Sequence, residues 1–368
     1  FEKDYADDFK ALFRGPRAFL NGEPLYDLAA IEANHLGNSY KYPPFFVLVM
    51  APLTGIPFGP AIQLWRALNL ACVLGAAWFL WRGGKQPLRS WSSLALLLLL
   101  LSLQPIHDSL RYGQVDGIIV LGVAAAYWAL RRGRWGWVGV ALALPIAMKL
   151  YPAFLLLHAG VRRRWRALLA AAVATAALTL LGIALLGWPV HATYLASVLP
   201  GSGGGTAWVE NQTINGFLNR LGASSVALLP DGGGVVSWLT YLGALALAAW
   251  TARRSLDRDE GAGYGLWVLA MLIAVPISWI HYEALLLVPL FHIFVVAERR
   301  ARPLEWRWVF VYALAWMLLA YGNQWTFFNR LWLGPAWALA LSYKWYGLLL
   351  LWLALAYDPL FGRQKDNG

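Results

Sequence analysis

The stretch WRALLAAAVATAALTLLGIALLGW, residues 165–188, decides the fold class. Apart from one arginine near its start it carries no charge, and it is long enough to cross the ~30 Å hydrocarbon core of a bilayer as a helix. Two further stretches have the same character, GPAIQLWRALNLACVLGAAWFLW (59–81) and SWSSLALLLLLLSLQPI (90–106). The sequence therefore predicts an all-α polytopic membrane protein.

Composition supports the same class of protein. The chain of 368 residues is 60% hydrophobic and only 13% charged, against roughly 25% charged residues in ordinary soluble domains. Its 22 tryptophans are typical of a chain with many membrane–water boundaries, where indole rings settle. Cys72 stands alone in an apolar run, so neither a disulfide framework nor a cysteine metal site is expected. Membrane lipids are therefore the predicted surroundings.

The net charge of +11 is arranged in short basic clusters between the apolar runs. Such clusters orient membrane proteins by staying in the cytoplasm, so no nucleic-acid partner is expected. The basic linkers are residues 82–89, 131–134, 161–166, 252–259, 298–307 and 362–368. The linkers between them, predicted to be extracytoplasmic, are residues 1–43, 104–116, 149–152, 188–234, 278–283 and 322–335. The two sets alternate without conflict, which predicts a multi-pass protein of the cell membrane with about eleven spans.

This topology also predicts a domain organisation. An even number of spans would need one more helix before Phe1, about twelve in all. We expect a single transmembrane domain over residues 1–368, with several short or broken helices. Residues 1–58 form its first extracytoplasmic loop with an interfacial helix, because five prolines interrupt residues 42–60. Residues 188–234 form a long extracytoplasmic loop.

Two pairs of spans are too short to be continuous. The residues between the basic clusters 131–134 and 161–166 have to go out and return, yet two full crossings need ~40 residues. The motif KLYP (149–152) should therefore turn partway through the membrane, inside protein or beside a cavity, because irregular backbone is not tolerated against lipid. The segment SWIHYE (278–283) is expected to repeat this arrangement in a milder form.

Uncommon polar residues collect in the extracytoplasmic linkers. They are Asp8, His107, Asp108, Arg111, Gln114, Asp116, Lys149, Asn211, Gln212, Asn215, Arg220, His281 and Arg330. Ionisable groups near membrane depth are costly and by default indicate function. A cavity with carboxylates, a lysine, arginines and a histidine suits chemistry on an anionic, lipid-linked substrate. Plainer interpretations stay open, since Asp8 could solvate a loop, Lys149 could snorkel and His281 could lie at the interface.

No cofactor is predicted. Zinc would need several closely spaced histidine, cysteine or carboxylate ligands, whereas the six histidines are scattered. Magnesium needs one or two carboxylates and a phosphate, so Asp7, Asp8 and Asp108 leave magnesium open.

Six motifs in a fixed order carry a resemblance to a known family. They are DFKALFRGPRAFLNGEPLY (8–26), KYPPFFVLVMAPL (41–53), RYGQVDGIIVL (111–121), AMKLYPAFLLL (147–157) followed by RRRWR (162–166), NQTINGFLNRL (211–221) and SWIHYEALLLVPL (278–290). In this order they resemble glycosyltransferase family 87, the polyprenyl-phosphate-mannose-dependent mannosyltransferases of the GT-C superfamily. The resemblance spans nearly the whole chain and implies a GT-C fold.

The resemblance implies an inverting glycosyltransferase. Its sugar, mannose in the family, comes from a polyprenyl monophosphate and passes to a lipid or glycan acceptor on the extracytoplasmic face. Asp8, followed by Phe9, matches the aspartate that serves as general base, with Asp7 as its neighbour. His281 is the second catalytic residue, facing the donor phosphate or supporting the base. The chain departs from the family at Asp116, where asparagine is expected after the Gly-Gln pair.

The chemistry of this reaction points to further residues. Polyprenyl phosphate leaves as an anion, so cations have to receive the growing charge. Lys149, Arg220 and Arg111 are the predicted phosphate-binding residues. The remaining predicted substrate contacts are Asp7, Tyr42, Gln114, Asp116, Tyr151, Asn211, Gln212 and Tyr282.

Three alternatives remain at this point. A lipid or lipid-linked sugar transporter could also use broken helices and a lysine within the membrane, although no obvious internal repeat is present and the cytoplasmic halves look apolar. A GT-C enzyme could use another sugar, such as glucose or arabinose. A non-catalytic scaffold would not require Asp8, Lys149 and His281 to meet.

Overall fold

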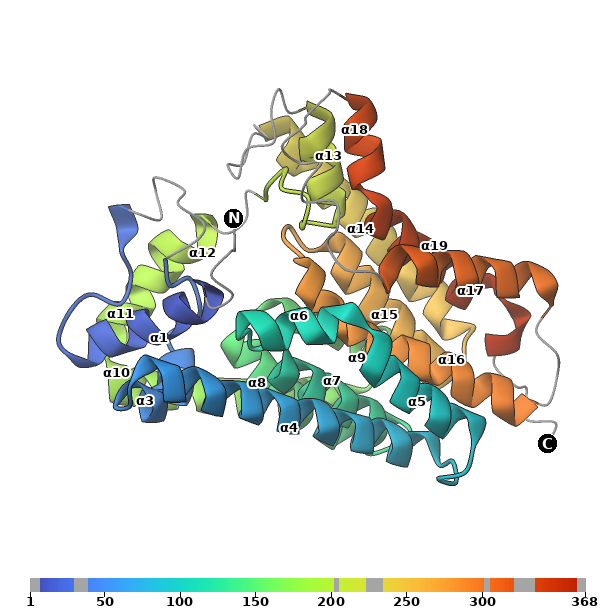
Figure 1. Ribbon diagram of the computed structural model, residues 1–368, viewed down its shortest axis with the longest axis horizontal. Helices are drawn as coiled ribbons and strands as arrows, with labels where there is room; N and C mark the ends of the chain where they lie inside the picture. Colours follow the sequence, from blue (N-terminus) through green and yellow to red (C-terminus); the bar gives the residue numbers. More distant parts are fainter. Residues whose placement is uncertain are drawn as a thin grey trace.

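The computed structural model describes residues 7–29, 39–201, 205–222, 234–300, 305–320 and 335–362. This part of the chain is almost entirely helical (Figure 1) and contains two isolated bridges, Asn211 with Trp279 and Arg258 with Gly362, in place of strands. The predicted all-α fold is confirmed. Arg330 and most of the predicted loop 322–335 lie outside the described residues.

The first half of the chain forms two groups of helices. The helices are α1 (Asp7–Leu20), α3 (Phe46–Thr54), α4 (Phe58–Gly84), α5 (Trp91–Ser102), α6 (Gln104–Tyr112), α7 (Asp116–Leu130), α8 (Trp135–Met148), η1 (Tyr151–Leu155), α9 (Leu156–Val161), α10 (Trp165–Leu186), α11 (Trp188–Thr193), η2 (Tyr194–Val198) and α12 (Leu199–Gly201). In Figure 1, α1, α3, α11 and α12 gather at one end of the long helix α4, while α5 lies toward the other end.

The second half of the chain builds the rest of the bundle. Its helices are α13 (Ile214–Gly222), α14 (Gly234–Leu256), α15 (Glu260–Ala274), η3 (Ile280–Leu286), α16 (Leu287–Arg300), α17 (Trp306–Leu319), α18 (Pro335–Leu341), α19 (Tyr343–Tyr357) and η6 (Pro359–Phe361). Figure 1 shows α13 and α18 together at one end of this half, beyond α14 and α19.

Several helices have the length and composition of membrane spans. Among the described residues, four are long and apolar enough, and the bent pair α5 and α6, with a 45° bend, would make a fifth. Five shorter apolar helices of 10–17 residues accompany them. Only 11% of the apolar windows of α10 and α14 is buried, which suits helices that face lipid. The chain is a polytopic membrane protein, and the number of eleven spans stays a prediction.

The core lies around α7 and α15. Helix α7 packs between α4 and α8, α8 packs on α10, and α15 contacts α14, α16 and α19. Gly139 allows α8 and α10 to approach closely, because a Cβ added there would lie 2.1 Å from the carbonyl oxygen of Ala167. Small residues let membrane helices come together in this way where no hydrophobic force drives them.

The two expected breaks are present. Helix α8 ends at Met148, Lys149 is extended, and the chain resumes as the short helices η1 and α9. Helix α15 ends at Ala274, and η3 precedes α16 in the same manner. A short helix also lies within residues 42–60, as expected, namely α3. Its interfacial position and the loop boundaries 1–58 and 188–234 stay predictions.

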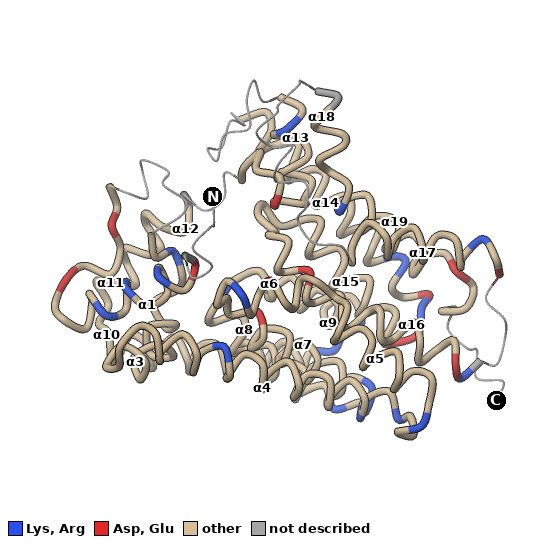
Figure 2. The backbone as a smooth tube through the Cα atoms, viewed as in Figure 1, with Lys and Arg blue, Asp and Glu red and all other residues tan. Residues whose placement is uncertain are grey.

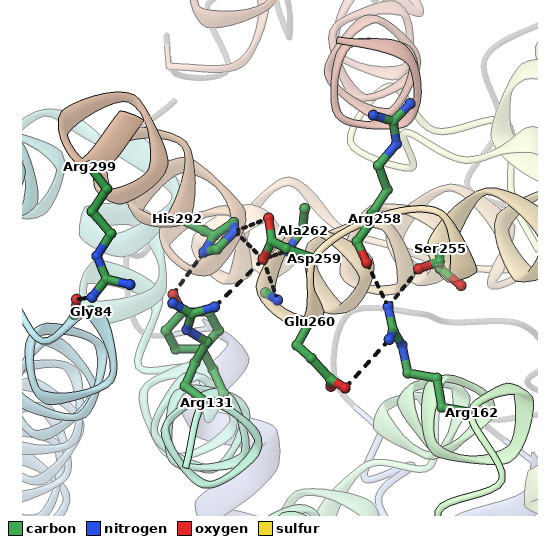
Figure 3. A network of polar contacts seen from close by, with 12 residues as sticks. Gly84, Arg131, Arg162, Ser255, Arg258, Asp259, Glu260, Ala262, His292 and Arg299 are labelled. Atoms are coloured by element: carbon green, nitrogen blue, oxygen red, sulfur yellow. Dashed lines mark hydrogen bonds and ion pairs between the residues drawn. The ribbon is translucent and has the colours of Figure 1, made fainter. Parts of the chain in front are cut away.

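Charged residues lie mostly at helix ends and in connections, with long uncharged stretches between them (Figure 2). A connected group of polar residues lies at the C-terminal end of α7 (Figure 3). There the carboxylate of Asp259 caps α15 by accepting from the amides of Gly261 and Ala262, at 2.9 and 3.3 Å. It also pairs with His292 at 3.1 Å and Arg131 at 3.6 Å.

The environment of Asp259 shifts its titration. Burial alone would raise the pKa of this carboxyl, but His292, Arg131 and the amide of Ala262 outweigh burial and hold it well below its usual range. A second ion pair beside it joins Arg162 to Glu260 at 3.4 Å. Together these contacts tie α7, the turn before α10, and α15 and α16 at the end that carries the basic linkers.

Candidate functional site

A cavity of about 530 Å³ opens where the two broken helices meet the N-terminal segment. Its wall comes from α1, the turn before α3, the break after α8, the region of η2 and α12, and the break before η3. The lining residues are Asp8, Ala11, Ser39, Lys41, Tyr42, Pro43, Gln114, Lys149, Leu150, Tyr151, Phe154, Tyr194, Leu199, Val275, Pro276, Ile277, Trp279 and Tyr282. Segments far apart in the sequence therefore form one pocket.

Asp8 reaches the pocket because its neighbour Phe9 is anchored. Phe9 is fully buried, with its ring centroid 5.5 Å from that of Phe58 and 6.5 Å from that of Trp65. Gly113 makes this approach possible, since a Cβ there would lie 2.8 Å from Phe9 Cβ. Asp8 lines the pocket, and no described residue forms a hydrogen bond or ion pair with its carboxylate.

Lys149 supplies a cation to the same pocket. Its Nζ lies 3.5 Å from Asp116 Oδ1, and the Lys149 side chain is only 8% exposed. Nζ also lies 4.2 Å from the ring centroid of Tyr282 and 5.4 Å from that of Tyr42. An ammonium has three hydrogens to donate, and Asp116 is the one carboxylate paired with it in the described part of the chain. Lys149 can therefore still bind an anion in the cavity.

Asp116 links Lys149 to His281. Its second oxygen, Oδ2, accepts from His281 Nδ1 at 2.6 Å, and its side chain is 1% exposed. No described residue hydrogen-bonds the other ring nitrogen, Nε2. The result is a continuous chain of contacts from the ammonium of Lys149 through one carboxylate to an imidazole.

Tyrosines complete the polar part of the wall. The Tyr42 hydroxyl donates to Gln114 Oε1 at 3.2 Å. Tyr151 stacks on Tyr282 with ring centroids 4.7 Å apart, and its buried hydroxyl has no partner among the described residues. Tyr151 lines the pocket, and its hydroxyl is buried behind that surface. Lys41 adds a second cation, whose pKa is lowered by burial.

Two predicted site residues, Asn211 and Gln212, support the pocket from behind its wall. Asn211 accepts from the amide of Ser278 at 3.0 Å and donates to Pro276 O at 3.1 Å. Gln212 donates to Leu341 O at 2.8 Å and accepts from the amide of Trp345 at 3.0 Å. The Asn211 contacts position the segment before η3, and the Gln212 contacts join its loop to α18 and α19.

Arg220 and Arg111 also lie away from the cavity. Arg220 is fully buried and donates to Ser342 Oγ and to the carbonyl oxygens of Trp208 and Asn211. Arg111 is exposed at the end of α6. Neither arginine lines the pocket, and the side chain of Asp7 lies outside the described part. Lys149 is thus the predicted phosphate-binding residue that the structure brings to Asp8.

Sequence analysis missed a second buried ion pair. Lys344 Nζ donates to Glu283 Oε2 at 2.9 Å and to Leu319 O at 2.7 Å, and both charged side chains are almost fully buried. The sequence shows one acid, Glu283, and one lysine, Lys344, within apolar stretches, but it does not show that they pair. The described residues hold no cluster of three histidine, cysteine or acidic side chains that could bind a metal, and the magnesium question stays open.

Comparison with known proteins finds similar mannosyltransferases. A polyprenol-phosphate-mannose-dependent α-(1-2)-phosphatidylinositol pentamannoside mannosyltransferase of Mycobacterium tuberculosis is 29% identical over 86% of this chain and 72% of its own length. A corresponding phosphatidylinositol mannoside mannosyltransferase of Mycolicibacterium smegmatis is 30% identical over 80% of this chain and 71% of its own.

Another relative transfers a different sugar. An α-(1->3)-arabinofuranosyltransferase of Mycobacterium tuberculosis is 30% identical over 53% of this chain and 44% of its own length. No solved structure matches the chain at a significant level. The sequence profile of glycosyltransferase family 87 matches residues 40–278, more than half of the chain. The chain belongs to glycosyltransferase family 87.

Proposed function

We propose that this glycosyltransferase transfers mannose from polyprenyl-phosphate-mannose to a hydroxyl of a lipid or glycan acceptor on the extracytoplasmic face of the membrane. The observation that carries the proposal is one cavity with the carboxylate residue Asp8 and the buried ammonium of Lys149 in its wall. The two relatives named as polyprenol-phosphate-mannose-dependent enzymes support this donor.

In the proposed reaction, Asp8 accepts the proton of the acceptor hydroxyl as its oxygen bonds to the anomeric carbon. The bond from that carbon to the phosphate oxygen breaks, and polyprenyl phosphate leaves with one additional negative charge. The ammonium of Lys149 stabilises this charge. The sugar passes through an oxocarbenium-like transition state. The carboxylate of Asp8 therefore also stabilises the positive charge that develops on the sugar.

The apolar part of the cavity suits a lipid-linked donor. Leu150, Phe154 and Leu199 line it beside the polar residues. A phosphosugar at Lys149 would thus have hydrocarbon-like surfaces next to it for the first prenyl units. This juxtaposition of an anion-binding group with apolar walls favours a lipid phosphate over a soluble sugar nucleotide.

The distribution of charge supports an extracytoplasmic site. Asp116 begins α7 on the pocket side, and Arg131 follows the other end of this helix of 15 residues, so the two lie roughly 22 Å apart along the membrane normal if α7 is upright. The arginine-rich end belongs in the cytoplasm by the positive-inside rule. The pocket then lies toward the opposite face.

Arabinofuranosyl transfer is a second candidate, favoured by the relative that carries that activity in its name. The experiment is a donor panel with purified protein in liposomes containing a membrane lipid extract. Synthetic polyprenyl phosphates of mannose, arabinofuranose and glucose are compared, and sugar transfer to lipid is followed by mass spectrometry. Transfer from the mannose donor supports the proposal, and transfer only from the arabinose donor replaces it. Donor movement across the bilayer without transfer would support a transporter.

A further inference from the structure

Asp116 differs from the pocket residues in its burial and its contacts. It is 1% exposed, and its two oxygens are each committed to a different functional side chain. Oδ1 faces Lys149 Nζ at 3.5 Å, and Oδ2 faces His281 Nδ1 at 2.6 Å. It does not line the pocket, so it lacks the access needed for direct contact with substrate.

We propose that Asp116 is a positioning residue that holds Lys149 and His281 as one unit behind the donor phosphate, an inference that rests on the proposed glycosyl transfer. An ionised carboxylate only accepts hydrogen bonds, so His281 Nδ1 carries the hydrogen. In the neutral ring the Nε2 lone pair then points away from Asp116, since the contact at one nitrogen sets the tautomer. The same carboxylate keeps the ammonium of Lys149 at the cavity wall.

An aspartate can perform this task and an asparagine cannot. The amide of asparagine has one accepting oxygen and one donating nitrogen. With its oxygen toward His281, its NH₂ faces the ammonium of Lys149, and two donors oppose each other. With its oxygen toward Lys149, its NH₂ faces Nδ1 and requires the opposite tautomer of His281. The first arrangement loses the contact with Lys149, the second reverses the tautomer of His281, and both lose the negative charge.

The contacts around His281 indicate that Asp116→Asn should change the orientation of side chains rather than the fold. Helix η3 is also held on its other side, where Glu283 pairs with Lys344 of α19 at 2.9 Å. The preceding segment is held by Asn211, which accepts from the amide of Ser278. These contacts do not involve Asp116, so η3 should keep its place in Asp116→Asn while the Lys149 and His281 side chains lose their common anchor.

The kinetic test uses the full chain in nanodiscs with polyprenyl-phosphate-mannose as donor. Loss of residues that orient functional ligands typically costs about 10- to 100-fold in activity, and we expect this loss in the kcat of Asp116→Asn. The double variant Asp116→Asn/His281→Ala should lose less activity than the product of the two single losses, because residues that act as a unit are not additive. Asp358→Asn is the matched control, a buried carboxylate at the far end of the bundle.

The protonation of the two ring nitrogens of His281 distinguishes a positioning role of Asp116 from a general loss of stability. In ¹⁵N-histidine-labelled protein in alkaline buffer, solid-state NMR should show His281 protonated at Nδ1, with the signal identified by its loss in His281→Ala. Asp116→Asn should alter that signal, and Asp116→Glu should restore part of the activity by returning the charge.

The outcomes divide clearly. Wild-type turnover in Asp116→Asn, losses that multiply in the double variant, or a wild-type His281 protonated at Nε2 would each overturn the inference. If Asp116→Asn does not fold, the wild-type nitrogen signature decides. An inactive wild type with His281 protonated at Nδ1 would overturn the proposed function and leave the Asp116 contacts intact.

Discussion

Replacement of Lys149 by glutamine tests the phosphate-binding role at its centre. Glutamine keeps much of the length of the side chain and removes its charge. The change removes the ammonium that faces Asp116 Oδ1, and loss of one member of a buried pair can cost ~3–5 kcal/mol of stability. The double variant Lys149→Gln/Asp116→Asn removes both charges, so it should recover stability without recovering activity. This pattern separates a folding defect from a catalytic one.

The size of the catalytic effect follows from the charge that develops on the leaving group. One additional unit of charge at ~4 Å from an ammonium is stabilised by ~4 kcal/mol at an effective dielectric constant of ~20. Each ~1.4 kcal/mol is tenfold in rate, so this is an upper value of roughly three decades. Removal of a single donor to a developing anion costs about 10²–10³-fold in kcat. We expect Lys149→Gln to fall within that range, because water in the cavity weakens the interaction.

The assay measures kcat and KM for transfer from polyprenyl-phosphate-mannose, with thermal unfolding followed on the same preparations. Since the donor already carries one negative charge, KM should rise as well, though less than kcat falls. Lys85→Gln is the control, because Lys85 ends α4 at the opposite end of that helix from the pocket. Turnover of Lys149→Gln within about 3-fold of the wild type, in folded protein, would refute the assignment of Lys149 to the leaving phosphate.

Three further predictions concern stability. The pKa of Asp259 is held below its usual range in the folded state. Its contribution to the free energy of unfolding is therefore present above the unfolded pKa of ~3.9 and is lost as the pH falls below that value. The difference in melting temperature between wild type and Asp259→Asn should narrow below about pH 4, and a constant difference would contradict this. Gly139→Leu should destabilise the bundle by at least ~1–3 kcal/mol in denaturant titrations, whereas Gly136→Leu on the same helix, where nothing lies within 4 Å, should not. Lys344→Met should cost ~3–5 kcal/mol, and adding Glu283→Gln should recover much of it in melting experiments; no recovery would argue against the pair.

The fold class and the breaks were predictable because they depend on length and local charge. Residues 165–188 can cross a bilayer in isolation, and arginine clusters mark the connections. The break at Lys149 followed from a count of residues between two basic clusters. The spans and breaks depend only on neighbouring residues, so one sequence is enough to predict them.

The site was only partly predictable because it depends on distant contacts. Asp116 contacts residues 33 and 165 positions away, and nothing local indicates that one carboxylate would serve both. Arg220 and Gln212 have polar side chains in an extracytoplasmic loop, which made them candidates, yet they hydrogen-bond the chain itself. A sequence shows that a polar residue is available but not whether its partner is protein or ligand.

The measurement that tests the central claim most directly compares the wild type with Asp8→Asn in single-turnover transfer from polyprenyl-phosphate-mannose, with donor binding measured on the same samples. General base catalysis contributes typically ~10²–10⁴-fold, so transfer should fall by that factor while donor affinity, which depends on Lys149, stays within about 3-fold. Equal transfer by the two proteins would contradict Asp8 as the base, and a parallel loss of donor binding would contradict the separation of the carboxylate from the phosphate site.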